Sequence, residues 1–142
     1  AQGDPVNKNG PSVDNPPVMG PAGRVHCTLQ DWAKFVADQL RGARGRTALL
    51  KVSTYQALHT PPFGGDYGLG WLVVKRDWGG GLVLHHAGDN TMNHANVWVA
   101  PQRDFAVLVC INQGGQAASS ASDEAAAALI RLHVPSSQAK EP

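Results

Sequence analysis

The stretch that decides the fold is Leu82-Val83-Leu84-His85-His86-Ala87-Gly88-Asp89-Asn90-Thr91, and two further apolar runs, Ala95–Pro101 and Phe105–Asn112, follow it. Short runs rich in β-branched and apolar residues, separated by turn residues, are typical of strands. The first run therefore predicts a strand over 82–87, which ends at a polar His-Ala-Gly. The next two predict strands over 94–100 and 105–111, with a turn between them.

A fourth strand is predicted just before this stretch. Residues 67–75 read Y-G-L-G-W-L-V-V-K, and a glycine-rich turn at 78–81 separates them from the strand over 82–87. Two strands joined in this way form a hairpin. The sequence thus predicts a meander of four antiparallel strands.

Helices are predicted on both sides of the strands. Apolar residues recur at helical spacing over 29–41, where Thr28 suits an N-cap and Asp31 the acidic position of a capping box. A short helix should follow over 53–59, with Ser53 as its N-cap. An alanine-rich helix should run from Ser122 to His133. Helices packed on an antiparallel meander make an α+β domain.

Composition divides the chain and excludes some functions. Residues 1–23, rich in Pro, Gly and Asn, predict an extended arm; 24–134 form the α+β body; and 135–142 predict a disordered polar tail. A net charge of +1 without a basic stripe argues against nucleic-acid binding. No apolar run approaches the roughly 20 residues of a membrane-spanning helix. Cys27 and Cys110 are expected to be buried packing residues rather than a disulfide.

Histidines are the candidate metal ligands. His85 and His86 are adjacent, so on a strand they face opposite ways, while His94 lies across a short turn from His86 and could approach it. No zinc-site spacing accompanies them, so we expect no metal and no cofactor. We expect one of the adjacent pair on the core face and the other in a cleft. A zinc site at His86 and His94 is the least favoured alternative.

Four segments, in the right order, carry a resemblance to a known family. Residues 21–35, with a T-x-x-D-x-x-x-F pattern, and the Y-G-L-G-W of residues 67–71 resemble segments of class C-type serine hydrolases. His86-Ala87-Gly88 stands where that family carries Lys-Thr-Gly or His-x-Gly, and residues 101–112 resemble its final turn and strand. The chain is similar to the C-terminal part of the serine β-lactamase and penicillin-binding-protein-like hydrolases.

The resemblance implies acyl transfer on a β-lactam, a peptide or an ester. It implies that His86 binds a substrate carboxylate or relays a proton. The backbone N–H of Asp89 would donate to the oxyanion, and Gly88 would let a substrate lie against the strand. Asn90 and Thr91 would line the same rim. The resemblance implies that the protein lies in the bacterial periplasm, is secreted, or lies in the cytoplasm.

The sequence departs from the family at the nucleophile. The family needs a Ser-x-x-Lys on a buried helix, and its only instance here is Ser137–Lys140, in the polar tail. We therefore expect a fragment or truncated member that is inactive or weakly active without a complementing N-terminal part. Self-association or such a complement should cover its open surfaces. A non-catalytic ligand- or partner-binding module on the same scaffold is the alternative.

Overall fold

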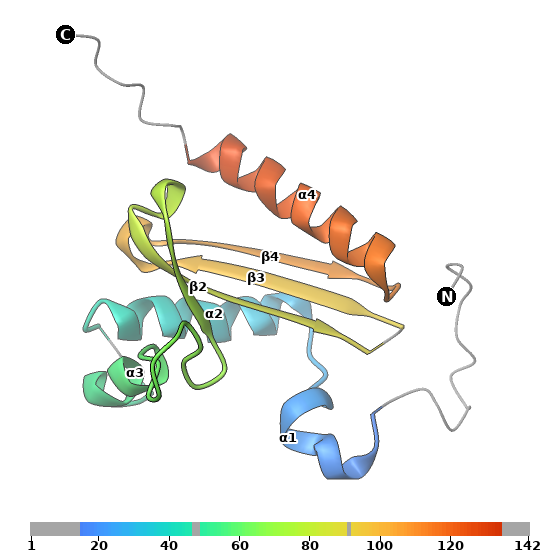
Figure 1. Ribbon diagram of the computed structural model, residues 1–142, viewed down its shortest axis with the longest axis horizontal. Coiled ribbons are helices and arrows are strands. Elements are labelled where there is room, and N and C mark those ends of the chain that lie inside the picture. Colours follow the sequence, from blue (N-terminus) through green and yellow to red (C-terminus); the bar gives the residue numbers. More distant parts are fainter. Residues whose placement is uncertain (1–14, 47–48, 91, 135–142) are drawn as a thin grey trace, which may run out of the picture.

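Four antiparallel strands form one sheet in the order β1-β2-β3-β4 (Figure 1). The computed structural model describes residues 15–46, 49–90 and 92–134. The strands are β1 (Leu72–Arg76), β2 (Gly81–Asp89), β3 (His94–Ala100) and β4 (Phe105–Ile111). Each pairs with the next along the chain, so the predicted meander is confirmed.

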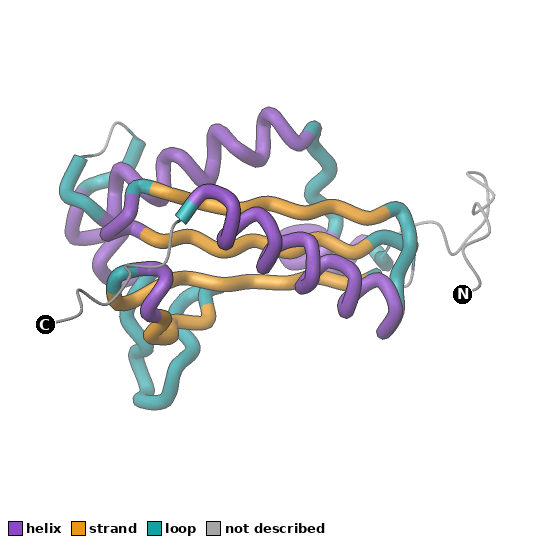
Figure 2. Tube along the Cα trace, turned by 90° about the horizontal axis from the view of Figure 1, so that it is seen from above, coloured by secondary structure: helices purple, strands orange, loops and turns teal. Residues whose placement is uncertain are grey.

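Two long helices cover opposite faces of this sheet, as Figures 1 and 2 show. Both contact β3 and β4. The helical segments are η1 (Pro17–Met19), α1 (Gly20–Gly23), α2 (Leu29–Ala43), α3 (Val52–Leu58), η2 (Asp77–Gly79), η3 (Pro101–Arg103) and α4 (Gln116–His133). The prediction of an α+β fold with flanking helices is therefore confirmed.

The start of α2 is fixed by the predicted cap. The backbone N–H of Asp31 donates to Oγ1 of Thr28 at 3.1 Å, and the Thr28 hydroxyl donates to Oδ2 of Asp31 at 2.8 Å. These contacts satisfy one of the N–H groups that a helix start leaves without an intrahelical partner. The helix then runs to Ala43, two residues beyond the predicted end.

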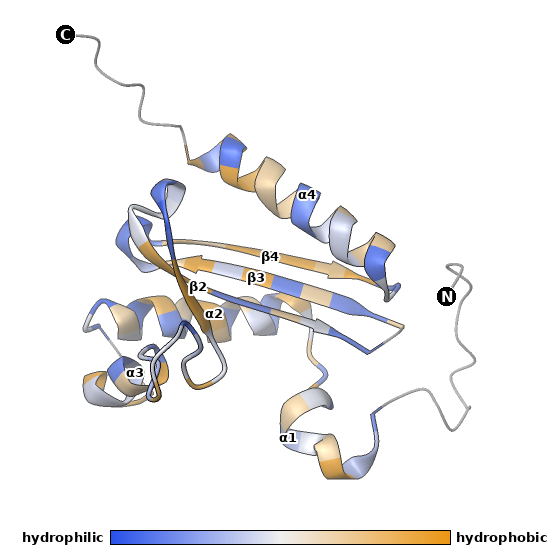
Figure 3. Cartoon of the chain, viewed as in Figure 1, coloured by the Kyte–Doolittle hydropathy of each residue, from blue (hydrophilic) through white to orange (hydrophobic). Residues whose placement is uncertain are grey.

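The core lies between α2 and the sheet. Val97 and Val99 of β3 point toward α2, because alternate residues of a strand share a face, and they pack with Val36 and Leu40. The alternate residues of β3, such as Asn96, face α4 instead. Figure 3 shows polar colours gathering along the half of β2 and β3 that lies toward α1. The apolar half of these strands is buried in the core, so the polar half is the part that can form a site.

The first strand is shorter than the sequence predicted. β1 begins at Leu72, and Tyr67 meets the sheet only through an isolated bridge to Leu72. Gly70 has a φ of +87°, a left-handed conformation that turns the chain back, and the N–H of Gly68 donates to the Trp71 carbonyl at 2.7 Å. The apolar pattern of 67–71 therefore serves a turn, and β1 does not extend beside the second half of β2.

The last helix begins six residues before its predicted start, at Gln116. Ser122 is not its cap but a fully buried residue inside it, where its hydroxyl accepts a hydrogen bond from the Asn96 amide at 3.1 Å. In α3 the N-cap is Lys51 rather than Ser53. A capping preference is local, and in α4 a tertiary hydrogen bond overrides it.

The chain ends and the cysteines also differ from expectation. Part of the predicted arm is helical, since η1 and α1 lie there, and the Asn15 side chain donates to the Gly23 carbonyl at 2.8 Å. Residues 1–14 and 135–142 lie outside the described residues. Cys27 and Cys110 are exposed rather than buried. Among the helices of the described ranges, none has the length and apolarity to cross a membrane.

Candidate site at the end of strand β2

Within the part of the chain that the structure describes, the second half of β2 has a neighbouring strand on one side only. β1 begins at Leu72, opposite His85, whereas β3 follows β2 as far as Asp89, which pairs with His94. Residues 86–89 are therefore bordered by β3 on one side and by the space that β1 does not reach on the other. An exposed strand edge of this kind presents backbone groups to whatever lies against it.

The direction of these backbone groups follows from the ladder. The N–H of Asn90 donates to the Asn93 carbonyl at 3.2 Å, so this pair is a hydrogen-bonded one. Hydrogen-bonded and non-bonded pairs alternate along an antiparallel ladder. The backbone N–H groups of His86 and Gly88 thus point toward β3. Those of Ala87 and Asp89 point to the other edge of β2, beyond the start of β1. The predicted oxyanion donor is aimed at that edge.

The His86 side chain lies beside an open groove. His86 pairs with Val97, so it is on the α2 face of the sheet, and it is exposed. The groove has a volume of about 820 Å³, within the roughly 300–1,000 Å³ usual for small-molecule sites. We call it the site groove; its lining includes His86, Gly88, Asp89 and Asn90 with Phe35, Gln39 and Trp71. The groove joins polar groups of β2 to an apolar wall from α2.

Gly88 borders unfilled space. A Cβ built on Gly88 would meet no heavy atom within 4 Å. The glycine is therefore not required by close packing of the described residues. Its lack of a side chain leaves room for a ligand to lie along the strand edge.

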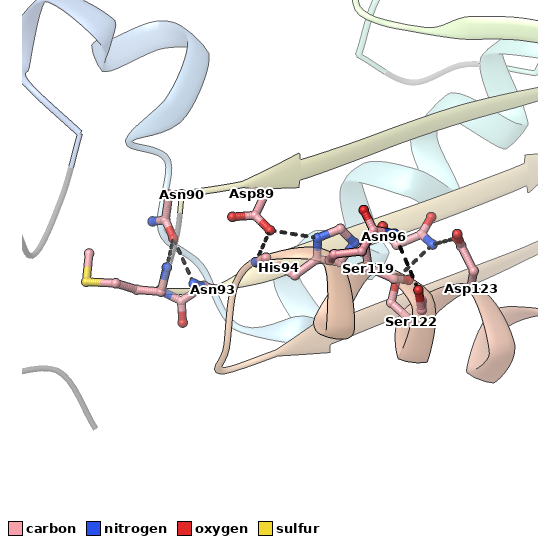
Figure 4. A network of polar contacts seen from close by, with 12 residues as sticks. Asp89, Asn90, Asn93, His94, Asn96, Ser119, Ser122 and Asp123 are labelled. Atoms are coloured by element: carbon pink, nitrogen blue, oxygen red, sulfur yellow. Dashed lines mark hydrogen bonds and ion pairs between the residues drawn. The ribbon is translucent and has the colours of Figure 1, made fainter. Parts of the chain in front are cut away.

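The Asp89 side chain ties three elements together, as Figure 4 shows. Its Oδ2 accepts the N–H of Gly115, just before α4, at 2.6 Å and lies 3.5 Å from Nδ1 of His94 at the start of β3. His94 is 5% exposed, and no hydrogen bond to either of its ring nitrogens is found among the described residues. We name the set Asp89, His94 and Gly115 the Asp89 clamp. It holds the end of β2 in place, and the sequence pointed only to the backbone of Asp89.

The turn after β2 is built by Asn90. Its side-chain oxygen accepts the N–H groups of Met92 at 3.2 Å and of Asn93 at 2.8 Å (Figure 4). This is the way an asparagine side chain commonly stabilises a turn. Asn90 also lines the site groove, as predicted for the rim. Thr91 lies outside the described residues.

The histidines near His86 point away from it. His85 faces the α4 side, where its ring stacks on Trp98 with centroids 3.9 Å apart and its Nδ1 lies 3.0 Å from the Val97 carbonyl oxygen. Burial lowers the pKa of His85. His94 pairs with Asp89, three residues from His86, so the two histidines leave opposite faces of the sheet. The two side chains therefore do not converge on one point, and no cluster of three metal-binding side chains is found within residues 15–46, 49–90 and 92–134.

Comparison with known proteins shows the family of the chain. The family model for Beta-lactamase matches residues 1–132, most of the 142-residue chain. No curated protein and no solved structure shows a significant match. The match includes every segment on which the sequence resemblance rested.

Proposed function

Because the chain belongs to the Beta-lactamase family, we propose that the end of β2 forms one wall of an acyl-transfer site. The substrate is a small acyl compound: a β-lactam, a peptide or a short ester. The observation that carries this proposal is the placement of His86, Gly88 and the Asp89 N–H along one strand edge beside the site groove. Family membership supports hydrolase chemistry, and the edge geometry supports this part of the site.

The backbone supplies the electrostatic part of the chemistry. Attack on an acyl carbonyl places negative charge on its oxygen, which needs fixed hydrogen-bond donors. The Asp89 N–H points to the open edge and is held there because the Asp89 clamp restrains this end of the strand. One donor of this kind lowers the barrier by about 3–4 kcal/mol. The open space at Gly88 lets the acyl group approach.

The imidazole of His86 supplies recognition or proton transfer. It is exposed on the α2 face and lines the same groove as the edge backbone. A histidine in this position binds a substrate carboxylate when protonated and relays a proton when neutral. Both roles place a polar end of the substrate at His86 and its carbonyl near Asp89.

The nucleophile comes from outside these elements. Acyl-enzyme chemistry needs a serine beside an activating base, and the only Ser-x-x-Lys of the sequence is Ser137–Lys140, after Pro135. We propose that a complementing segment with this motif docks on the chain, which alone binds ligand with little or no turnover. β4 is an edge strand of the described sheet and is apolar along its length, so it suits pairing with that segment or a second copy.

Ligand binding tests the wall of the site. We expect a carboxylate-bearing β-lactam to shift the backbone amide resonances of residues 86–90. His86→Ala should weaken this binding about tenfold, equivalent to about 1.4 kcal/mol. His133→Ala is the matched control, since His133 is exposed at the far end of α4 and should leave the affinity unchanged. Equal affinity in the two variants would remove His86 from the site.

Covalent labelling tests the source of the nucleophile. Intact-mass spectrometry after incubation with a reactive β-lactam should show no adduct on the chain alone. An N-terminal fragment of a family member that carries Ser-x-x-Lys should restore an adduct, located on that fragment. An adduct on Ser137, or on any serine of this chain, contradicts the proposal. Ligand binding without acylation in any complemented form would favour the non-catalytic binding module.

A further inference from the structure

Two cysteines that lie far apart in the sequence share one cavity. Cys27 precedes α2 and Cys110 is the penultimate residue of β4. Both are exposed, and both line a second cavity of about 620 Å³, together with Thr28, Trp32 and His94. This cavity lies between the start of α2 and the adjoining ends of β3 and β4. The fold thus brings two thiols to one opening.

The strand register places the Cys110 thiol on the side where α2 lies. Cys110 pairs with Ala95, which is two residues from Val97, and Val97 packs into the core beneath α2. Cys27 stands two residues before Leu29, the first residue of that helix. Figure 1 shows the link between α1 and α2 at the same end of the sheet as the C-terminal end of β4. Both thiols therefore lie at the open border of the interface between α2 and β4.

The link that carries Cys27 has room to adjust. Residues 24–28 form neither helix nor strand, whereas Cys110 is held within a paired strand. A disulfide needs its two Cβ atoms about 3.8 Å apart, so at least one partner must be able to settle into that geometry. Here the movable partner is Cys27.

Electrostatics supports the proximity of the two thiols. The pKa of Cys110 is raised, mainly by the partial desolvation of its thiol and further by the negative charge of the Cys27 thiolate. A charge acts in this way only on a nearby group, because its influence falls with distance and is screened by solvent. The thiolate fraction of Cys110 at neutral pH is reduced as a result, which disfavours Cys110 as the first thiol to react.

We propose that Cys27 and Cys110 form a reversible disulfide bond across this cavity, which makes it a redox-modification site. The oxidant is a small-molecule disulfide such as oxidised glutathione. The Cys27 thiolate attacks one of its sulfur atoms; the S–S bond breaks, one glutathione thiolate leaves, and a mixed disulfide forms on Cys27.

The second exchange closes the bond. The Cys110 thiolate attacks Sγ of Cys27 and displaces the remaining glutathione thiolate. The two protein thiols lose two electrons, and the small disulfide becomes two thiols that take up the two protons released by the cysteines. The product ties the link 24–28 to β4. The proposal does not depend on the acyl-transfer wall, although Val25 and His26 of the link also line the site groove and His94 of the Asp89 clamp lines this cavity.

Intact-mass spectrometry of the whole chain tests the proposal. Treatment with oxidised glutathione should give a loss of about 2 Da, the two thiol hydrogens, without a retained glutathione. Tryptic digestion without reductant should then join the peptides 25–34 and 104–131. Cys27→Ser and Cys110→Ser are the matched controls, and each should retain a single glutathione. A wild-type chain that retains two glutathiones, or that links only to a second copy, overturns the proposal.

A second measurement shows whether the fold brings the thiols together. The equilibrium constant for disulfide formation against glutathione should be at least about tenfold larger in the folded chain than in concentrated urea, because a disulfide that fits the native state stabilises it. The oxidised chain should also melt at a higher temperature than the reduced one. Equal constants in the two solvents would contradict a fold-directed pair.

Discussion

In the hairpin of β2 and β3, Oδ2 of Asp89 lies 3.5 Å from Nδ1 of the buried His94. The same oxygen accepts the N–H of Gly115. Replacing Asp89 with Ala removes both of these contacts at once. We expect the free energy of unfolding to fall by about 1 kcal/mol, because the Gly115 N–H loses its acceptor and the buried His94 ring loses the carboxylate beside it. Urea unfolding at about pH 8 measures it.

Glu124→Ala is the control for this change. Glu124 is also acidic, but it is exposed on α4, and a substitution there should alter stability by no more than about 0.5 kcal/mol. Equal losses in the two variants would show that the Asp89 clamp does not stabilise the fold.

The contact between Asn96 and α4 should be energetically coupled. Asn96 is 1% exposed, and its amide donates to Oγ of Ser122 at 3.1 Å and to Oδ1 of Asp123 at 2.8 Å. A double-mutant cycle with Asn96→Ala and Ser122→Ala should give a coupling energy of roughly 0.5–3 kcal/mol, as expected for groups in one buried network. Strict additivity of the two losses would show that the hydrogen bond adds nothing to stability.

A methyl group at Gly42 should disturb the packing of α2 on α3. A Cβ at that position would overlap the ring of Tyr55, which is fully buried and donates a hydrogen bond to Asp38. We expect Gly42→Ala to lower stability by about 1–3 kcal/mol through overpacking. Gly20→Ala is the control, since its Cβ meets no atom within 4 Å. Thermal melts of the two variants should separate clearly, and coincident melts would contradict the prediction.

Stability should fall as the solution is made mildly acidic. Burial lowers the pKa of His59 and of His85 from an ordinary value of 6.5. The unfolded chain therefore binds more protons than the folded one just below pH 6.5, so these groups favour folding above that pH and lose this effect below it. The urea midpoint should fall as the pH is lowered from about 8 to about 5.5.

His59→Gln tests the contribution of one of these groups. Nε2 of His59 lies 2.9 Å from Oε1 of Gln39, and a glutamine side chain can also donate to that oxygen without titrating. The variant should show a smaller decrease of the urea midpoint across the same pH range. A decrease as large as that of the wild type would remove His59 from the pH dependence.

Most elements of the fold were predictable because their signals are local. The cap of α2 depends on Thr28 and Asp31, three residues apart, and the strands over 94–100 and 105–111 depend on short apolar runs. The family resemblance was predictable for the same reason, since it rests on short motifs kept in order, and the family match confirms it.

Other features depend on residues distant in sequence. Ser122 was predicted to begin a helix, yet it lies within α4 because Asn96 of β3 binds it. Cys27 and Cys110 were predicted to be buried as small apolar residues, yet the packing of α2 against β4 leaves both exposed. No local pattern reports which surfaces a fold will cover.

The candidate site combines both kinds of information. The sequence by itself determined the residue types at the end of β2 and the likeness of His86-Ala87-Gly88 to a hydrolase motif. Only the tertiary structure decided that β1 stops opposite His85, that the Asp89 N–H faces the open edge, and that His86 and His94 lie on opposite faces. The physical reason is that periodicity and capping act within a few residues, whereas register and burial arise only when strands and helices pack together.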